Sequence, residues 1–188
     1  MDSNIKRLLI RCKEENLLVA IYSNRNEPDN FSAGFIEALS EEQIILKHVT
    51  SNGLYDGYVV RNLGDIFRID YNGLYEKRLL NLYQLQKQKH LESFLENKIN
   101  KNSNLFYETL VAARKHKVVV NICIDVTETQ ESIIGWVTNI QGMEVTISKI
   151  SFEGLDDGES IFDIADIIKI NCDSDDEKVM GLLNLNQK

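Results

Sequence analysis

Hydrophobic positions at the start of the chain follow the period of an amphipathic helix. Ile5, Leu8, Leu9 and Cys12 are spaced i, i+3, i+4 and i+7, so that in a helix they would share one face. The same spacing recurs 101 residues later, at Phe106, Thr109, Leu110 and Ala113. We therefore predict a helix near each of these two positions.

Five segments with strand character follow each predicted helix. They are residues 17–23, 32–39, 43–50, 57–61 and 65–70 after the first helix, and residues 118–124, 133–140, 144–151, 158–162 and 166–170 after the second. Val145 and Ile147 alternate with polar neighbours, which is the period of a half-buried strand. Ile150 falls out of this phase, and we expect a bulge there. The short connections favour antiparallel neighbours.

The two sets of elements repeat one pattern. Residues 5–77 align without a gap on residues 106–178, and after a slip of two residues the Leu-Leu-Asn-Leu run at 79–82 matches 182–185. Solenoid repeats are about 20–50 residues long, so this longer period indicates a duplicated domain. We predict a first domain at residues 1–83, a linker at 84–104 and a second domain at 105–188.

The predicted linker has the composition of a helix. Residues 79–99 contain neither Gly nor Pro and are rich in Leu, Gln, Lys and Glu, whereas the Asn-rich residues 100–104 would end a helix. We expect this helix to act as a spacer between the two domains.

Glycines retained in both copies predict backbone constraints. Gly34 and Gly135 suit a strand that bends or approaches another backbone closely, and Gly57 and Gly158 suit a turn with positive φ. Trp136 follows one of these glycines, and we expect its ring to be largely buried.

The order of apolar motifs points to a family. Each copy has an apolar first strand, then Gly with a large apolar residue, an Ile-containing third strand and a final Ile-x-x-Ile. The segments are residues 17–19, 34–36, 44–46 and 66–69 in the first copy and 118–120, 135–137, 145–147 and 167–170 in the second. A helix followed by five short, bent antiparallel strands resembles the Sm-like (LSm) barrel, and other SH3-like small barrels share most of these motifs. The resemblance implies a mainly β protein with two five-stranded barrels, each preceded by a helix and joined by a helical linker.

Composition and charge narrow the class of protein. The apolar fraction is 43% and the charged fraction 27%, which is typical of a globular protein. The net charge is −8 overall, with −2 for residues 1–83, +2 for residues 84–104 and −8 for residues 105–188. A surface for nucleic acid needs concentrated positive charge, and the second copy offers the reverse.

Cysteines and hydropathy predict a cytoplasmic protein. Cys12, Cys123 and Cys172 lie far apart without a Cys-x-x-Cys pair, which favours buried thiols over disulfides or a zinc site. We expect no signal peptide and no membrane span, because no apolar run approaches about 18 residues.

Signals of catalysis are weak. The chain has three histidines and lacks a Gly-x-Ser-x-Gly motif, a phosphate-binding loop and metal-spaced His/Cys clusters. We expect a protein that is not an enzyme and that needs no cofactor or metal.

The first copy nevertheless carries basic residues interleaved with aromatic ones. Such sets bind single-stranded RNA, since rings stack on bases while cations hold phosphates. The candidates are Lys47, His48, Tyr55, Tyr58, Arg61, Asn62 and Arg68. In Sm-like proteins the RNA contacts cluster in two loops, which here would be residues 40–42 and 61–64. Two glutamates in the first loop would repel phosphate, and a solvated face with tyrosines lying on the barrel is the alternative interpretation.

The second copy has acidic residues in the corresponding region. Glu153, Asp156, Asp157 and Glu159 form a candidate docking face for a basic partner, or a solvated rim. Their spacing does not match a calcium-binding loop.

These observations favour a non-catalytic adaptor or regulatory protein that binds other proteins, because open barrel edges invite strand addition. The alternative is an RNA-associated protein that binds a short single strand through its first copy. Sm-like barrels assemble into rings by pairing edge strands, but we expect a monomer or homodimer rather than a ring of three chains, because the linker would separate the barrels.

Overall fold

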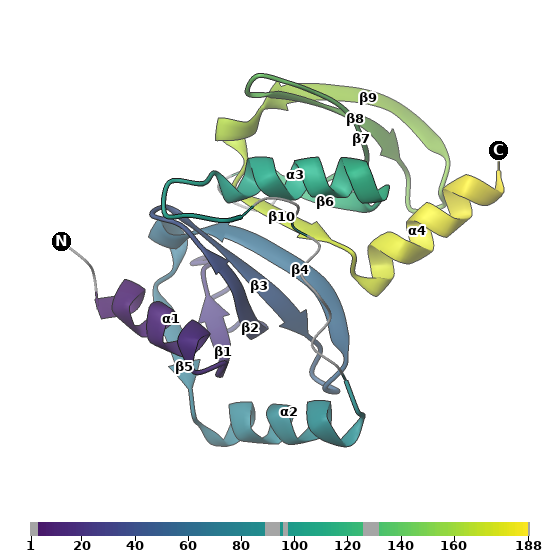
Figure 1. Ribbon diagram of the computed structural model, residues 1–188. Coiled ribbons are helices and arrows are strands. Elements are labelled where there is room, and N and C mark those ends of the chain that lie inside the picture. The colour runs from purple at the N-terminus through teal and green to yellow at the C-terminus, as the bar shows by residue number, and fades with distance from the viewer. Residues whose placement is uncertain (1–3, 89–94, 96–97, 126–131, 188) are drawn as a thin grey trace. The chain divides into compact units, whose positions relative to one another are not determined.

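The structure is a computed structural model that describes residues 4–88, 95, 98–125 and 132–187. The chain divides into unit 1, Met1–Ser93 with Ile99–Leu105, and unit 2, Phe94–Lys98 with Phe106–Lys188. The described residues form four α-helices and ten strands in a mixed α/β arrangement, and neighbouring strands within each unit are antiparallel (Figure 1). None of the described helices is both long enough and apolar enough to cross a membrane.

Unit 1 is a five-stranded sheet with one helix before it and one after it. Its elements are α1 (Asn4–Glu14), β1 (Leu18–Tyr22), β2 (Ser32–Leu39), β3 (Gln43–Val49), β4 (Tyr55–Asn62), β5 (Arg68–Tyr71) and α2 (Leu74–Leu85). The strand order is β5-β1-β2-β3-β4, so the last strand lies beside the first.

Unit 2 has the same order of elements. They are α3 (Leu105–His116), β6 (Val119–Cys123), β7 (Ile133–Gln141), β8 (Glu144–Ile150), β9 (Asp156–Asp163), β10 (Lys169–Cys172) and α4 (Asp175–Asn186). The strand order is β10-β6-β7-β8-β9. Cross-strand partners also correspond at an offset of 101, since Val19 opposes Gly34 and Val120 opposes Gly135.

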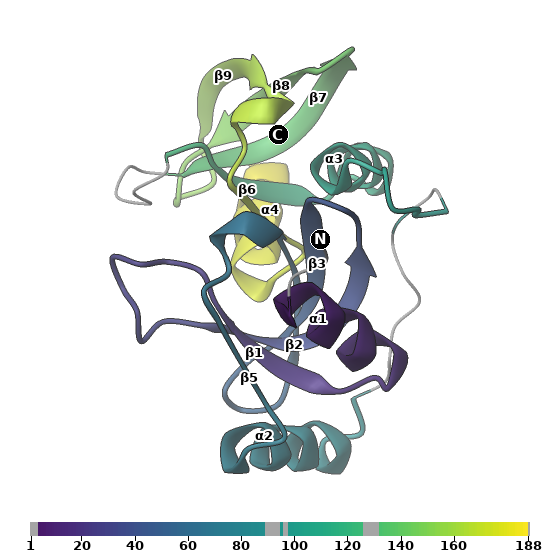
Figure 2. The same cartoon turned by 90° about the vertical axis from the view of Figure 1, so that its left-hand side faces the viewer.

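Both faces of the unit 1 sheet are packed. On one face Leu9 and Cys12 of α1 contact apolar strand residues, as their predicted spacing requires; these are Val19, Ile21, Ile36, Ile44, Leu46 and Val59. On the other face Leu79 and Tyr83 of α2 contact Leu18, Ala33, Phe35 and Val49. Adjacent strand residues point to opposite faces, which explains why Leu18 and Val19 belong to different clusters. Figure 2 shows α1 and α2 separated by the strands of this sheet.

Unit 2 is packed by the corresponding residues. Met180 of α4 contacts Val119, Ile134 and Ile150, and Trp136 packs partly buried against this cluster. Phe106, Leu110 and Ala113 of α3 are buried, which confirms the second helical stripe. All three cysteines are buried free thiols, as expected, and burial raises the pKa of Cys172 well above its usual value.

Close backbone contacts explain the retained glycines. A Cβ on Gly34 would lie 2.0 Å from the Lys47 carbonyl oxygen, and one on Gly135 would lie 2.1 Å from that of Ser148. Gly57 and Gly158 have φ of 72° and 76°, as predicted. The strand register shifts at the predicted bulge, between Ser148 and Ile150, and at the equivalent place in β3.

The helix expected over residues 79–99 begins and ends earlier than predicted. It begins at Leu74 and ends at Leu85, and it belongs to unit 1 because its buried side chains pack on that sheet. Described residues beyond it, at positions 88, 95 and 98–100, are not helical, and residues 89–94 and 96–97 lie outside the described part. The predicted helix over 79–99 is therefore confirmed at residues 79–85, and the helical spacer is wrong at the described residues beyond them.

Helix α4 was not predicted, and the two-residue slip predicted at the end of the repeat is wrong. Helices α2 and α4 correspond at an offset of 101, without the two-residue slip, because Leu82 contacts Gly53 as Leu183 contacts Gly154. Short 3₁₀ turns, Leu63–Asp65 and Ile164–Asp166, precede the last strands, which begin about three residues later than predicted. Trp136 is only partly buried, in contrast to the expectation of a largely buried ring.

Candidate functional site

The candidate RNA-binding residues lie on three strands. Lys47 and His48 are in β3, and Tyr55, Tyr58, Arg61 and Asn62 are in the neighbouring β4. Arg68 is in β5, at the other end of the sheet order. The structure thus brings six of the seven together on adjacent strands.

Lys47 is a packed residue. It is 3% exposed, its Nζ lies 3.3 Å from Glu37 Oε2, and it sits 5.9 Å from the Tyr58 ring centroid. A buried ammonium needs such a partner, because desolvation without one is costly. Its ammonium group therefore pairs with Glu37 inside unit 1, and a phosphate could reach it only by displacing Glu37.

Three other candidates on these strands also contact one another or the rest of unit 1. His48 Nδ1 lies 3.2 Å from Asp56 Oδ2, and the Tyr55 and Tyr58 rings meet edge to face at 5.9 Å. The Tyr55 backbone N–H donates to the side chain of Gln88. These contacts favour the interpretation of tyrosines lying on the sheet.

Arg68 is exposed but paired. Its guanidinium donates to both oxygens of Asp70, at 3.0 and 2.6 Å, and lies 4.4 Å from the Tyr22 ring centroid. The hydrogen bond from Arg68 lowers the pKa of Asp70, and that from the Tyr22 hydroxyl adds to the effect. Arg68 is the one RNA candidate whose cation is presented to solvent over an aromatic ring.

The acidic candidates of unit 2 fall into two groups. Glu153 accepts from Ser151 Oγ at 2.8 Å, which lowers its pKa, while Asp156 accepts from Asn184 at 2.9 Å and Asp157 lies 3.0 Å from Lys149 Nζ. Glu159 is exposed in β9. Three of the four carboxylates therefore have local structural contacts.

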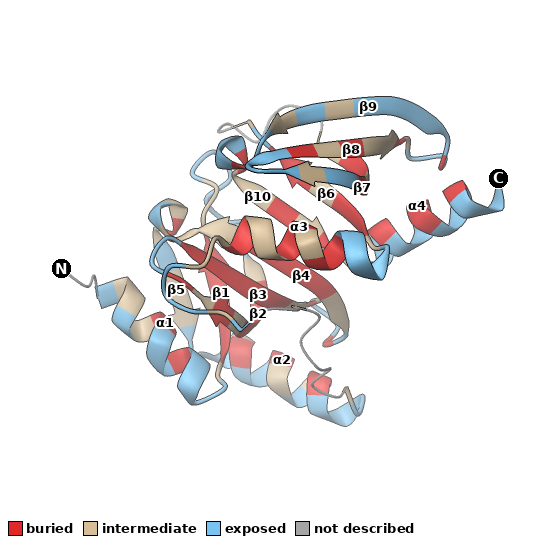
Figure 3. Ribbon diagram, turned by 45° about the horizontal axis from the view of Figure 1, so that its top comes forward, coloured by how far each residue is buried: buried red, intermediate tan, exposed pale blue. Residues whose placement is uncertain are grey.

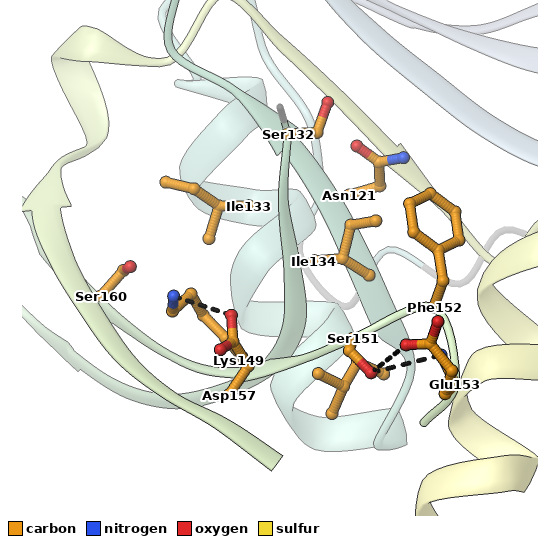
Figure 4. A pocket seen from close by; sticks show the side chains of 11 residues that line it. Asn121, Ser132, Ile133, Ile134, Lys149, Ser151, Phe152, Glu153, Asp157 and Ser160 are labelled. Atoms are coloured by element: carbon orange, nitrogen blue, oxygen red, sulfur yellow. Dashed lines mark hydrogen bonds and ion pairs between the residues drawn. The ribbon is translucent and has the colours of Figure 1, made fainter. Parts of the chain in front are cut away.

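A cavity of about 540 Å³ opens on the α4 face of unit 2 (Figure 4). It is lined by Asn121, Ser132, Ile133, Ile134, Lys149, Ile150, Ser151, Phe152, Glu153, Asp157 and Ser160. Figure 4 shows the Lys149–Asp157 ion pair and the Ser151–Glu153 hydrogen bond on separate parts of its rim. The buried Oδ1 of Asn121 has no hydrogen-bond partner among the described residues.

Unit 1 has an aromatic cluster that unit 2 lacks. Tyr22 and Phe31 lie 5.1 Å apart and Phe31 and Tyr75 5.2 Å apart, between ring centroids. The positions 101 residues later are Cys123, Ser132 and Asp176, none of which has a ring. Of these three positions only Ser132, which replaces Phe31, lines the cavity. The repeat alignment shows this replacement, but it was not used to predict a cavity, because a serine by itself does not indicate one.

The cavity combines serines, an ion pair and apolar side chains in its lining. Its lining contains serines, but no histidine or cysteine stands beside them to act as a base or nucleophile. The part of the chain that the structure describes contains no group of three His, Cys, Asp or Glu side chains placed to hold a metal ion. Its mixture of apolar walls and a polar rim is suited to binding.

Comparison of the chain with protein-family models, curated proteins and solved structures gave no match.

Proposed function

We propose that the protein is a non-catalytic binding or adaptor protein built from two Sm-like barrels, and that its main partner is another protein. The strand order supports this architecture, since the last strand of each unit returns to lie beside the first, β5 beside β1 and β10 beside β6. Bulges in the second and third strands of each unit supply the bends. The common order of elements supports a duplicated domain.

The observation that carries the proposal is the open edge of unit 2. Strand β9 pairs with β8 on one side, and within the described part of unit 2 no strand pairs with its other side. Its side chains are mostly exposed (Figure 3), and Ile161 is 67% exposed. Phe152 and Leu155, just before the strand, are exposed as well. An edge with unpaired backbone groups and apolar side chains is suited to receiving an extended segment of a partner.

The test is capture of partners from native lysate by the tagged protein and by Ile161→Lys. A lysine on an edge strand opposes strand addition, so we expect the variant to lose specific protein partners while its circular dichroism is unchanged. Asn139→Lys is the matched control, because it adds the same charge at an exposed position of β7, which is paired on both sides. Equal recovery of partners by both variants would refute binding at this edge.

The oligomeric state separates the protein-binding proposal from the RNA alternative. We infer a monomer or homodimer, and light scattering should give one or two times 21.6 kDa. A mass of three chains would instead favour a ring and, with it, the RNA alternative.

One observation favours RNA binding by unit 1. Arg25 lies 5.0 Å from the Phe67 ring centroid, and Arg68 lies over Tyr22, so cations and rings are presented together. The 260/280 nm absorbance ratio of the purified protein separates the two functions, because co-purifying nucleic acid raises it. Arg25→Ala should then lower binding to a labelled oligouridine, whereas Arg7→Ala, an exposed position on α1, should not.

A further inference from the structure

A second concave surface of unit 2 lies between α3 and α4. Two hollows of about 250 and 300 Å³ share Lys117, Val118, Trp136 and Leu185, and together they form one groove. Trp136 of β7 is part of its floor, partly buried and still accessible.

Gly181 creates the room in which the indole lies. A Cβ at this position would already approach Trp136 Cη2 to 3.2 Å and Val119 Cγ2 to 3.1 Å. The counterparts in unit 1 are Leu80 and Phe35, so unit 1 combines a larger helix residue with a smaller ring. Replacement of Leu80 by Gly181 compensates for replacement of Phe35 by the larger Trp136, so the two side chains together fill a similar volume. The indole of Trp136 remains partly accessible to solvent.

The α4 wall of the groove is apolar and open to solvent. Leu182 and Leu185 line it and are 68% and 60% exposed. Their counterparts on α2 are Asn81 and Gln84, both exposed polar residues that suit the outer face of a helix. Because unit 1 forms the same fold without exposed leucines at these positions, folding does not require them, and an exposed apolar wall of this kind indicates an interaction site.

The α3 side of the groove is cationic. Arg114 and Lys117 line it, and neither makes an ion pair within the described residues. The two carboxylates that also line the groove are already engaged. Asp173 lies 3.6 Å from Lys178 Nζ, and buried Glu177 accepts from the backbone N–H at the start of α4. The local charge open to a ligand is therefore positive, although unit 2 is acidic.

We propose that this groove binds a short acidic peptide segment of a partner protein, with a bulky apolar side chain against Trp136, Leu182 and Leu185 and carboxylates at Arg114 and Lys117. The inference rests on the proposed protein-binding function and names the chemistry of one partner segment. The net negative charge of unit 2 does not oppose it at contact range, because physiological salt screens exposed charges beyond about 8 Å. Burial of the apolar side chain would supply affinity, and the two cations would select acidic flanks.

Trp136 is the single tryptophan of the chain, so its emission reports directly on the groove. The probe is a pool of ten-residue peptides with a central Leu or Phe flanked by Asp and Glu, compared with a pool in which Lys replaces the acids. We expect the acidic pool to shift the emission saturably and the basic pool to leave it unchanged. Absence of a saturable shift up to about 1 mM peptide, the weak limit for a specific site, would overturn the proposal.

Variants make the test specific. Arg114→Glu with Lys117→Glu should weaken binding of the acidic pool at least tenfold, whereas Arg114→Lys should retain it. Leu182→Asn with Leu185→Gln installs the unit 1 residues, and it should abolish binding while leaving the urea midpoint unchanged. Unaltered binding by either double variant would contradict the assigned groove. Ile161→Lys should bind the acidic pool as the native protein does, because it leaves the groove unchanged. If Ile161→Lys loses its lysate partners and the native protein binds no acidic peptide, the groove proposal is refuted. The β9 proposal would then still stand.

Discussion

The sheet face beneath the C-terminal helix is packed with aromatic rings in unit 1 and with a polar network in unit 2. In unit 1 the rings of Phe35 and Tyr83 lie 5.3 Å apart. At the equivalent positions of unit 2, Trp136 Nε1 donates to Asn184 Oδ1 at 3.1 Å. Asn184 is 1% exposed, and its Nδ2 donates to the Gly154 carbonyl and to Asp156 Oδ1, both at 2.9 Å.

The comparison shows which features this fold demands. Both units keep a glycine where the helix crosses the preceding loop, at Gly53 and Gly154, with φ of 81° and 78°. A Cβ added to either glycine would lie within 2.6 Å of the Cβ of a leucine on that helix. Contacts this close tolerate no side chain. The side chains beneath the helix can be exchanged, provided that volume is compensated and buried polar groups remain hydrogen-bonded.

The largest expected effect tests what the units share. Gly34→Ala and Gly135→Ala should each destabilise their unit by more than about 3 kcal/mol, because the new methyl group would overlap a backbone carbonyl and the strands must separate. Urea unfolding followed by circular dichroism checks both, and Trp136 emission follows unit 2. Gly64→Ala is the control, since nothing lies within 4 Å of its Cβ position. A loss below about 1 kcal/mol in either glycine variant would contradict the close approach.

The next test separates the two kinds of packing. Tyr83→Ala should cost about 3–5 kcal/mol, because it removes a buried ring. Asn184→Ala should cost about 1–3 kcal/mol, because the indole N–H and the Gly154 carbonyl lose their partner. Urea midpoints compare the variants, and a more damaging Asn184→Ala would show that the network contributes more than the rings.

A double-mutant cycle tests the volume exchange. Gly181→Leu alone should destabilise unit 2 by about 1–3 kcal/mol through overlap with the indole. Combined with Trp136→Phe, which restores the unit 1 pair, much of this loss should be recovered, with a coupling of about 0.5–3 kcal/mol. Unfolding is followed by circular dichroism, because the double variant has no tryptophan. Simple additivity would refute the compensation.

The smallest effect concerns pH. Asp70 of unit 1 has a pKa lowered by Arg68, whereas the equivalent residue in unit 2 is Asn171, which does not titrate. A lowered pKa means that the stabilisation is present above the unfolded-state value of about 4 and is lost as the pH falls through the folded-state value. Asp70→Asn should therefore cost less than about 1 kcal/mol at pH 7, as is usual for exposed pairs. The difference from the native protein should vanish near pH 2, and a constant difference would contradict this assignment.

Local patterns predicted most elements of both units. Short-range periodicity predicts the apolar stripes of α1 and α3, the β-favouring runs and the bulge at Ile150, because each of these depends on neighbours within a few residues. Helix α4 was missed because it is apolar on its inner and outer sides and shows no stripe. Its capping pair, Ser174 and Glu177, was an available signal, since the Ser174 N–H donates to Glu177 at 2.9 Å.

Candidate sites were predicted less well than elements. Lys47 was predicted to be a cation that a ligand could reach, but it is paired with Glu37 in the interior of unit 1. The Trp136 groove arises where Leu80 and Phe35 of unit 1 are replaced by Gly181 and Trp136 in unit 2, and residue type alone does not reveal an empty volume.

The sequence by itself determined the repeat, its register through residue 77, most strands and the glycines that close backbone contacts require. These depend on backbone conformation and short-range periodicity, which each residue type biases directly. Only the tertiary structure decided the position of α2, the presence of α4, the burial of Lys47 and the opening of the groove beside Trp136. Those features depend on which side chains from distant segments share one volume, and packing of that kind is settled only when the sheet and its helices meet.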